Sequence, residues 1–470
     1  MDTSKFIKIK QLLSKWTENT KFENNVYVVG GCVRDMLMEH PIKDIDIAVN
    51  IPDGGLKLAE YLYNSNKIYR KPVLYPTYGT SMFIVDVDGE SFELEAVQTR
   101  KEKYTDPTQR NPTTAFGTIE EDCLRRDLTI NSLYQNVSND EIIDITKNGI
   151  DDIKNKIIRT PCDPDITYDD DPLRILRCVR FASRYNWEID KETYESMKRN
   201  IHRLSIISKE RIQAELSKML TCDYPSISLK HLRDIGAFYM IDPILQNIYS
   251  NEYLWNHMIK SIEYAKSFYN EDCSEELILS IFLEPYSIMA PKESETYLYS
   301  KDPITNLLKS LKYSNAIIDS VKSILKFADR SLYENAIESY ILRNPLNLYG
   351  QGELRIDFNK PVLRLIQNEC RSKSIMKSSL ILAESYFINS DFHNELMFNP
   401  YRDIMREIIN DDEFFTYKLP ITGQDIMTEL NIQPGPDVKE KLDHAYRIAF
   451  QEPDVTREQI LMKLSEANNQ

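Results

Sequence analysis

The amino-acid sequence predicts an α+β domain at the N-terminus, followed by a chain that is all-α. Short apolar runs typical of β-strands occur before residue 150, and helix-type spacing dominates after it. Glycine is scarce, with 13 residues in 470, which favours helix. So long a chain needs more than one core. We therefore divide it into a head (1–140), a neck (141–220), a helical body (221–390) and a helical tail (391–470).

Composition excludes several classes of protein. No apolar run approaches the roughly 20 residues of a membrane span, so we expect no membrane partner. Seven scattered cysteines form no C-x-x-C pair and the six histidines show no metal spacing, which indicates free thiols in a reducing compartment. The net charge of −15 requires any nucleic-acid-binding surface to be local. Residues 1–20 favour an amphipathic helix and carry no signal-peptide core.

The stretch 26–50 carries the first candidate site. An apolar run, Val26 to Val29, precedes a helix-like segment, and a second apolar run holds Asp44 and Asp46. Two carboxylates two residues apart in a strand share a face, so they can hold a metal pair. Magnesium, Mg2+, is the expected ion, because it prefers oxygen ligands and accepts substrate phosphates. A lone D-x-D is more often a solvated strand end.

A glycine pair lies between those two runs. Gly30 and Gly31 open a turn at a helix start, where free N–H groups favour a phosphate, and Arg34 follows three residues later. Alone, such a pair is usually only a turn. Together with the two aspartates, it indicates a site for a nucleoside triphosphate.

Two further segments of the head have recognisable patterns. Residues 82–98 alternate around Asp88-Gly89 and predict a β-hairpin whose second strand places Glu93 and Glu95 on one face. Residues 100–118 are polar and aperiodic, which favours a mobile loop or a plain connector.

Residues 120–137 predict a helix with a buried stripe of Leu124, Leu128 and Leu133. Asp127 and Asn131 would then share a face that could hold a ribose. An exposed helix with a polar pair is the simpler alternative.

A second candidate stretch covers residues 169–190, with predicted helices at 171–186, 192–204 and 208–220. Arg174, Arg177 and Arg180 recur every three residues after Asp170 and Asp171. An internal salt-bridge ladder is one interpretation. The other is chemical, because the Asp171 carboxylate and the Arg174 guanidinium can imitate the pairing edge of a base, which leaves the later arginines for phosphates.

These motifs resemble the class II tRNA nucleotidyltransferase and bacterial-type poly(A) polymerase family, within the polymerase-β-like superfamily. The resemblance lies in G-G-x-V-R-D with D-x-D, L-E-A-V-Q-T-R, R-R-D-x-T-x-N-S, D-D-P-L-R and E-R-I-x-x-E-L, all between residues 26 and 220. A weaker match follows at 421–438, where ordinary helix capping is an equal alternative to contacts with RNA phosphates.

The resemblance implies a role for each group of residues. It implies a metal site at Asp44 and Asp46 with Glu95 as third carboxylate, triphosphate contacts from Gly30, Gly31, Arg34, Arg126, Arg177 and Arg180, sugar contacts from Asp127 and Asn131, and base selection by Asp170, Asp171 and Arg174. It also implies that loop 100–118, with Arg100, Tyr104 and Arg110, helps to add the final A, and that Glu210 and Arg211 brace the base-selecting helix while Glu215 is structural.

The implied activity is CCA addition to the acceptor stem and 3′ end of tRNA from CTP and ATP, of eukaryotic type. A poly(A) polymerase, or an enzyme adding only CC or only A, is the alternative, and a non-catalytic RNA-binding protein is a distant one. We expect a monomer in the cytoplasm, with nuclear and mitochondrial locations left open.

Overall fold

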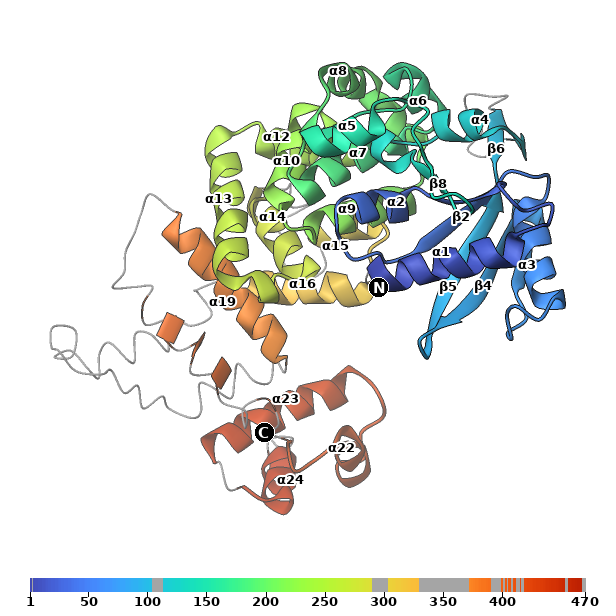
Figure 1. The fold of residues 1–470 in the computed structure, drawn as a ribbon. Helices are drawn as coiled ribbons and strands as arrows, with labels where there is room; N and C mark the ends of the chain where they lie inside the picture. The colour runs from blue at the N-terminus through green and yellow to red at the C-terminus, as the bar shows by residue number, and fades with distance from the viewer. Residues whose placement is uncertain are drawn as a thin grey trace, which may run out of the picture. The chain divides into compact units, whose positions relative to one another are not determined.

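The computed structural model describes residues 1, 3–103, 113–289, 303–328, 372–389, 418–452 and 455–466, with a few positions between 399 and 415 (Figure 1). The chain divides into two compact units, residues 1–246 and 247–470. Strands occur in the first unit, and every described element of the second is helical. This confirms the predicted fold class. The finer division into head, neck, body and tail stays a prediction.

A seven-stranded mixed sheet organises the first unit, with strand order β3-β4-β5-β2-β1-β8-β9. Strands β2 and β5 are parallel, and every other neighbouring pair in this sheet is antiparallel. The strands are β1 (Val26–Val29), β2 (Ile45–Val49), β3 (Val73–Tyr75), β4 (Thr80–Val87), β5 (Glu90–Gln98), β8 (Tyr134–Asn136) and β9 (Ile142–Ile143). The predicted hairpin at 82–98 is thus confirmed as β4 and β5.

Different helices pack on the two faces of this sheet. Helices α1 (Thr3–Thr17) and α3 (Gly54–Asn64) pack on one face (Figure 1) and bury a large apolar core there. On the opposite face a smaller cluster of Tyr27, Val29, Ala48, Cys123 and Tyr134 is covered by α4 (Ile119–Leu124). Alternation along β5 leaves Glu93 and Glu95 exposed on that second face. Part of one sheet face is therefore open to a ligand.

Helices follow the sheet up to the end of the first unit, joined by the short strands β10 (Ile157–Ile158) and β11 (Glu188–Ile189). They are α5 (Gly149–Asn155), α6 (Pro164–Asp170), α7 (Leu173–Tyr185), α8 (Lys191–Asn200), α9 (Lys209–Leu220), α10 (Pro225–Asp234) and α11 (Ala237–Ile241), after α2 (Gly31–Leu37) near the start of the chain. Helix α7 packs against α9 and α10. The predicted helices near 171–186, 192–204 and 208–220 are confirmed as α7, α8 and α9.

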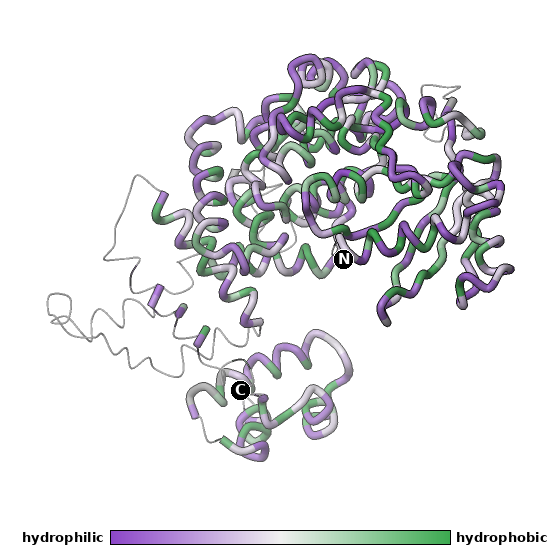
Figure 2. Tube along the Cα trace, in the orientation of Figure 1, coloured by the Kyte–Doolittle hydropathy of each residue, from purple (hydrophilic) through white to green (hydrophobic). Residues whose placement is uncertain are grey.

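The second unit is a set of helices, and α12 (Pro243–Tyr249) spans its boundary with the first. Helix α19 (Lys373–Ile388) packs against α13 (Glu252–Tyr269), α14 (Glu275–Met289) and α16 (Asn315–Ala328), with α15 (Pro303–Ser310) beside them. Helices α22 (Gly423–Glu429), α23 (Pro436–Gln451) and α24 (Arg457–Glu466) share a separate apolar cluster. Hydrophobic and hydrophilic stretches alternate along the helices of both units (Figure 2). No described helix has both the length and the hydropathy that crossing a bilayer requires.

Three local predictions were wrong or incomplete. The helix expected over 120–137 ends at Leu124, which is exposed, and a 3-10 turn (Thr129–Asn131) and β8 follow. Asp44 precedes β2 rather than lying in it. The loop expected at 100–118 begins and ends as an antiparallel pair, β6 (Arg100–Lys103) with β7 (Thr113–Phe116), and its Tyr104 and Arg110 lie outside the described residues.

Predictions about single residues are confirmed at two places. The six described cysteines are free thiols, whereas Cys370 lies outside the described residues. Thr422 caps α22 through a reciprocal capping box with Asp425, so the capping alternative at 421–438 holds for this helix start.

Candidate active site

Two strands bring carboxylates together on the open face of the sheet. Asp46 of β2 and Glu95 of β5 are direct partners in the parallel register, so their side chains leave the sheet on the same side. Asp44 lies two residues before Asp46, and both aspartates are exposed. Surrounding atoms partly desolvate Asp46, and Glu95 and Asp44 repel it, so its pKa is raised although Arg126 opposes the shift. These carboxylates concentrate negative charge that a cation would stabilise.

This donor set suits a hard divalent cation. All three groups supply oxygen, and their exposure leaves room for further ligands from water or phosphate. Within the described ranges, no three histidine, cysteine or acidic side chains converge closely enough to form a complete metal cage. Asp44, Asp46 and Glu95 are the side chains that could contribute oxygen ligands to such a cation.

The glycine turn lies beside two arginines. Gly30 has φ +69°, a conformation that side chains rarely adopt. A Cβ on Gly30 would lie 3.1 Å from Arg126 Nη1, and one on Gly31 would lie 3.5 Å from Arg34 Nη2. The missing side chains thus let backbone and guanidinium groups approach closely, which creates positive charge near the carboxylates.

We expect Gly30→Ala to lower the free energy of unfolding by about 1–2 kcal/mol, because it forces alanine into a left-handed conformation. It should also raise the KM for nucleotide, since the new Cβ pushes against Arg126. The control is Gly89→Ala, where φ is +81° but no atom lies within 4 Å. It should lose similar stability in urea denaturation and keep the wild-type KM. Equal KM values for both variants would contradict the contact with Arg126.

Arg34 is held between the sheet and α7. Its guanidinium pairs with Asp35 at 2.7 Å and donates to the Asn131 side-chain oxygen. It also lies over the rings of Phe181 and Tyr185, 5.2 and 5.6 Å from their centroids. Stacking and the ion pair fix this cation in one orientation.

Arg126 belongs to a buried charged cluster around Asp122. The Asp122 carboxylate accepts from Arg125 at 2.7 Å and Arg126 at 3.2 Å, and from the Tyr134 hydroxyl. Burial alone would raise the pKa of Asp122, but the two arginines and the Tyr134 hydrogen bond hold it at about 2. The cluster thereby fixes Arg126 beside Gly30.

Asp127 and Asn131 are close together, although not on a helix. The 3-10 turn brings the Asn131 amide to within 3.1 Å of Asp127 Oδ1. Arg177 of α7 donates to the other Asp127 oxygen at 2.7 Å. Asp127 and Asn131 are both buried. The predicted pair therefore connects the sheet domain to α7.

The arginines of α7 face acids from other elements. Arg180 donates to Glu215 of α9 at 2.6 Å, and Arg177 lies 3.8 Å from the same carboxylate. Arg174, which is buried, donates to the Thr167 carbonyl at 3.3 Å and lies 3.9 Å from Glu102 of β6. The arginines thus form ion pairs, but with acids of distant segments, so the interpretation as an internal ladder was wrong. Glu215 has the structural role that we predicted.

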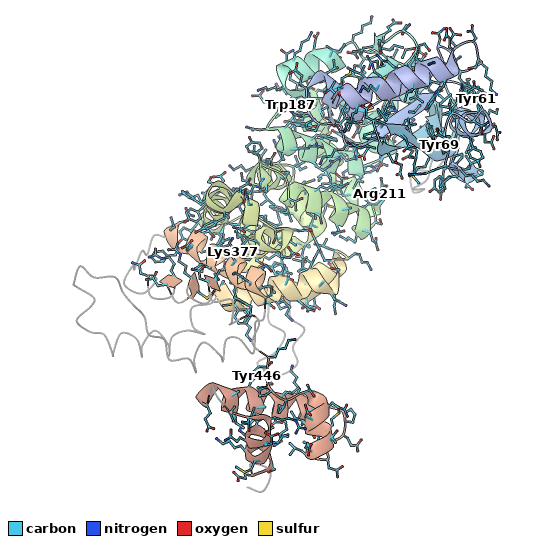
Figure 3. The ribbon with its side chains drawn as sticks, turned by 60° about the horizontal axis from the view of Figure 1, so that its bottom comes forward. Tyr61, Tyr69, Trp187, Arg211, Lys377 and Tyr446 are labelled. Carbon is cyan, nitrogen blue, oxygen red and sulfur yellow. The ribbon has the colours of Figure 1, made fainter. Side chains whose placement is uncertain are left out.

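The backbone N–H of Arg174 donates to the Asp171 carbonyl at 3.0 Å, but among the described contacts their side chains do not pair with each other. Arg211 of α9, labelled in Figure 3, reaches Asp171 at 2.7 Å. This matches the prediction that Arg211 braces the helix. Burial raises the pKa of Asp170, which Arg174 opposes and Glu102 and Asp171 reinforce. Asp170, Asp171 and Arg174 therefore meet where α6 ends and α7 begins.

Sequence reasoning missed two acids at this site. Asp122 stands three and four residues before Arg125 and Arg126, a spacing that indicates helical ion pairs. Glu102 contacts Arg125 at 3.0 Å and lies near Arg174. Its position depends on the pairing of β6 with β7, and nothing in the local pattern indicated that pairing.

Comparison with known proteins indicates the family of this chain. Residues 26–159 match the family model described as "Poly A polymerase head domain", and residues 186–248 match "Probable RNA and SrmB- binding site of polymerase A". The mitochondrial CCA tRNA nucleotidyltransferase of Saccharomyces cerevisiae is 28% identical over 97% of this chain and 92% of its own length. The CCA-adding enzyme of Ligilactobacillus salivarius is 30% identical over 71% of this chain and 78% of its own.

Solved structures agree on the fold. The Bacillus stearothermophilus CCA-adding enzyme in complex with CTP superposes with a TM-score of 0.60 at 20% identity, covering 98% of each chain. A likeness at this identity supports the fold, and the relatives in sequence support the family. The chain therefore belongs to the CCA-adding tRNA nucleotidyltransferase family.

Proposed function

We propose that this protein adds C, C and A in turn to the 3′ end of tRNA, using CTP and ATP and releasing pyrophosphate without a nucleic-acid template. One observation carries the proposal: Asp46 and Glu95 lie in register on an open sheet face, and Arg126, held against the Gly30 turn, is close enough to affect the pKa of Asp46. Carboxylates that hold cations, beside arginines that hold phosphates, are the parts that nucleotidyl transfer needs.

Asp44 and Asp46 are the proposed metal ligands, with Glu95 as the third carboxylate. When bound, Mg2+ would supply Lewis-acid chemistry, lowering the pKa of the attacking 3′-hydroxyl and neutralising charge on pyrophosphate. The parallel pairing of β2 with β5 fixes the spacing of Asp46 and Glu95 before substrate arrives. That preorganisation limits the rearrangement needed during the reaction.

The triphosphate would lie against the Gly30-Gly31 turn, with Arg34 and Arg126 as its nearest cations. Arg177 would add a contact, since its side chain is 33% exposed while it also pairs with Asp127. Arg180 is mostly buried against Glu215, so a phosphate contact there requires that pair to open. Asp127 orients Asn131 for the sugar by accepting a hydrogen bond from its side-chain amide.

Base selection is assigned to the junction of α6 and α7. Asp171 would accept from an exocyclic amino group, and Arg174 would donate to ring nitrogen or carbonyl acceptors. Arg211 holds the Asp171 carboxylate, and half-buried Asp170 lies alongside. Fixed donors and acceptors of this kind distinguish cytosine and adenine from the other two bases.

We expect Arg174→Ala to reduce the preference for CTP and ATP over UTP and GTP by about tenfold, the size of one lost bidentate base contact. Single-turnover incorporation into tRNA ending before C, C or A measures it, with Arg184→Ala on the same helix as control. Arg184 lies over Tyr185 and is outside the assigned site. An equal loss of rate with all four nucleotides would assign Arg174 a structural role.

The activity test uses purified full-length protein, tRNA lacking its last three nucleotides, and each nucleotide separately and together. The proposal expects CTP to add two residues and ATP to add one only after them. Long A tracts on any RNA would indicate a poly(A) polymerase, and CC alone or A alone would indicate a partial enzyme. Binding of tRNA without incorporation by any preparation would indicate a non-catalytic RNA-binding protein.

We also propose an RNA partner, an oligomeric state and a cellular location for this protein. The acceptor stem and 3′ end of tRNA are the proposed RNA partner, and the protein is proposed to act as a monomer in the cytoplasm, with nuclear and mitochondrial pools as further locations. Sedimentation and cell fractionation test these points.

A further inference from the structure

We propose that one edge of the head sheet binds the single-stranded RNA that leads into the active site. The surface consists of β3 and the turns beside it, and we call it the β3 edge patch. It rests on the proposed function and adds a contact surface to it. Its members are exposed cations and tyrosines: Lys67, Tyr69, Arg70, Lys71, Tyr75 and Tyr78.

Exposure singles out this segment. Of fifteen exposed large hydrophobic side chains in the described part of the chain, five lie within residues 63–78. Tyr69 is 88% exposed and Tyr78 72%, and Figure 3 labels Tyr69 on the part of the first unit that holds the sheet. One exposed tyrosine needs no explanation. A group of them offers flat aromatic faces on which unpaired bases can stack.

Charge in the same segment is opposite to that of the whole chain. Residues 66–78 contain three cations and no acid, in a chain of net charge −15. In the described residues Lys67 and Lys71 have no carboxylate partner, and Arg70 donates to the Ser91 hydroxyl at 3.2 Å. By contrast, the nearby hairpin acids Asp88 and Glu90 pair with lysines of α1. The patch therefore keeps its positive charge available for phosphates.

Strand register connects the patch to the carboxylates. Val73 of β3 pairs with Met82, Met82 with Glu95, and Glu95 with Asp46. Residues paired in this way lie on the same face, so Val73 and Tyr75 face the same side as Asp46. Val73 and Asp46 are three strand spacings apart across the sheet, or roughly 14 Å. RNA with its 3′ end at Asp46 can thus cross β5 and β4 and reach β3.

An edge strand can instead pair with a strand of another protein, but this edge is poorly suited to that. Strand β3 has three residues, and Pro72 and Pro76 stand directly before and after it. Proline has no N–H to donate and, with lysine, is typical of edges protected from strand pairing. The observations therefore favour RNA over a protein strand.

The test compares two double variants of the full-length protein with wild type. Tyr69→Ala with Tyr78→Ala removes stacking, and Lys67→Gln with Lys71→Gln removes charge. The matched control is Tyr253→Ala with Phe268→Ala, two aromatic residues that are 51% and 71% exposed on helix α13 and lie outside the matched segment 186–248. The dissociation constant of tRNA lacking its last three nucleotides is measured across a salt series, and nucleotide KM values are measured at saturating tRNA.

The tyrosine variant should bind tRNA about a hundredfold more weakly, or about tenfold for each of its two lost stacking contacts. The lysine variant should reduce the slope of log affinity against log salt by about 1.4, or 0.7 per phosphate contact. Nucleotide KM should stay unchanged in both. Wild-type affinity and slope in both variants would overturn the inference. So would a wild-type dimer that the variants convert to monomer, which would make the patch an interface between copies.

Failure of this inference is distinguishable from failure of the proposed function. A wild-type protein that binds tRNA but incorporates nothing contradicts the function, whereas the binding series still decides the role of the patch. Unchanged thermal unfolding confirms that the exposed substitutions leave the fold intact.

Discussion

Asp46→Asn should slow nucleotide incorporation by about a hundredfold or more while the protein stays folded, and this is the largest effect that we expect on activity. The substitution keeps the size of the side chain and removes the charge that would hold a cation beside Glu95. Loss of one preorganised charge at a reacting centre typically lowers kcat by about a hundredfold or more. Rapid-quench incorporation of CTP into tRNA measures it.

The same substitution should not destabilise the protein. Because desolvation and the repulsion from Glu95 and Asp44 raise the pKa of Asp46, its charge opposes folding above that pKa when no cation is bound. Removing the charge should therefore leave the unfolding temperature of the metal-free protein unchanged or higher, a common exchange of stability for activity.

The control is Glu93→Gln, which neutralises an exposed carboxylate two residues from Glu95 on the same strand face. It should retain nearly wild-type incorporation, because Glu95 and not Glu93 is the direct partner of Asp46 and one of the charges that raise its pKa. Equal losses in Asp46→Asn and Glu93→Gln would mean that overall charge matters, and would contradict the assignment of Asp46 as a ligand.

The carboxylates could be predicted from sequence because local rules decide their placement. Alternation along a strand fixes which side chains share a face, so Asp46 and Glu95 each had a predictable side. Their direct pairing also needed β2 and β5 to lie side by side and parallel. Only the resemblance to a family indicated that Glu95 completes the site.

The segment after Glu120 shows where local reasoning fails. Helical spacing of leucines extended the predicted helix to residue 137, but the helix ends at Leu124 and leaves that side chain exposed. Arg126 then bonds to Asp122 and Tyr134, contacts that depend on β8 pairing with β1. Tertiary contacts outweighed periodicity here.

Contacts of α7 were equally hidden from the sequence. Its arginines were visible as a repeating row, but their partners Asp127 and Glu215 are 50 and 35 residues away. The Asp171–Arg211 pair spans 40 residues. Sequence spacing predicts pairs within one helix, and it cannot choose among acids from separate elements.

Asp122→Asn should lower the free energy of unfolding at neutral pH by about 3 kcal/mol, the lower end for breaking a buried ion pair, because Arg125 and Arg126 keep some contact with solvent. The folded-state pKa of Asp122 is about 2, below the roughly 3.9 of an unfolded aspartate. The stabilisation is therefore complete above the unfolded value and is lost as pH falls through about 2, so the two proteins should converge in acid.

Urea denaturation at pH 7 and at pH 3 measures the difference, with exposed Asp151→Asn as control at well under 1 kcal/mol. A constant difference at both pH values would show that Asp122 acts through packing rather than charge. Since the cluster also fixes Arg126 beside Gly30, the variant should bind nucleotide more weakly under conditions where it is still fully folded.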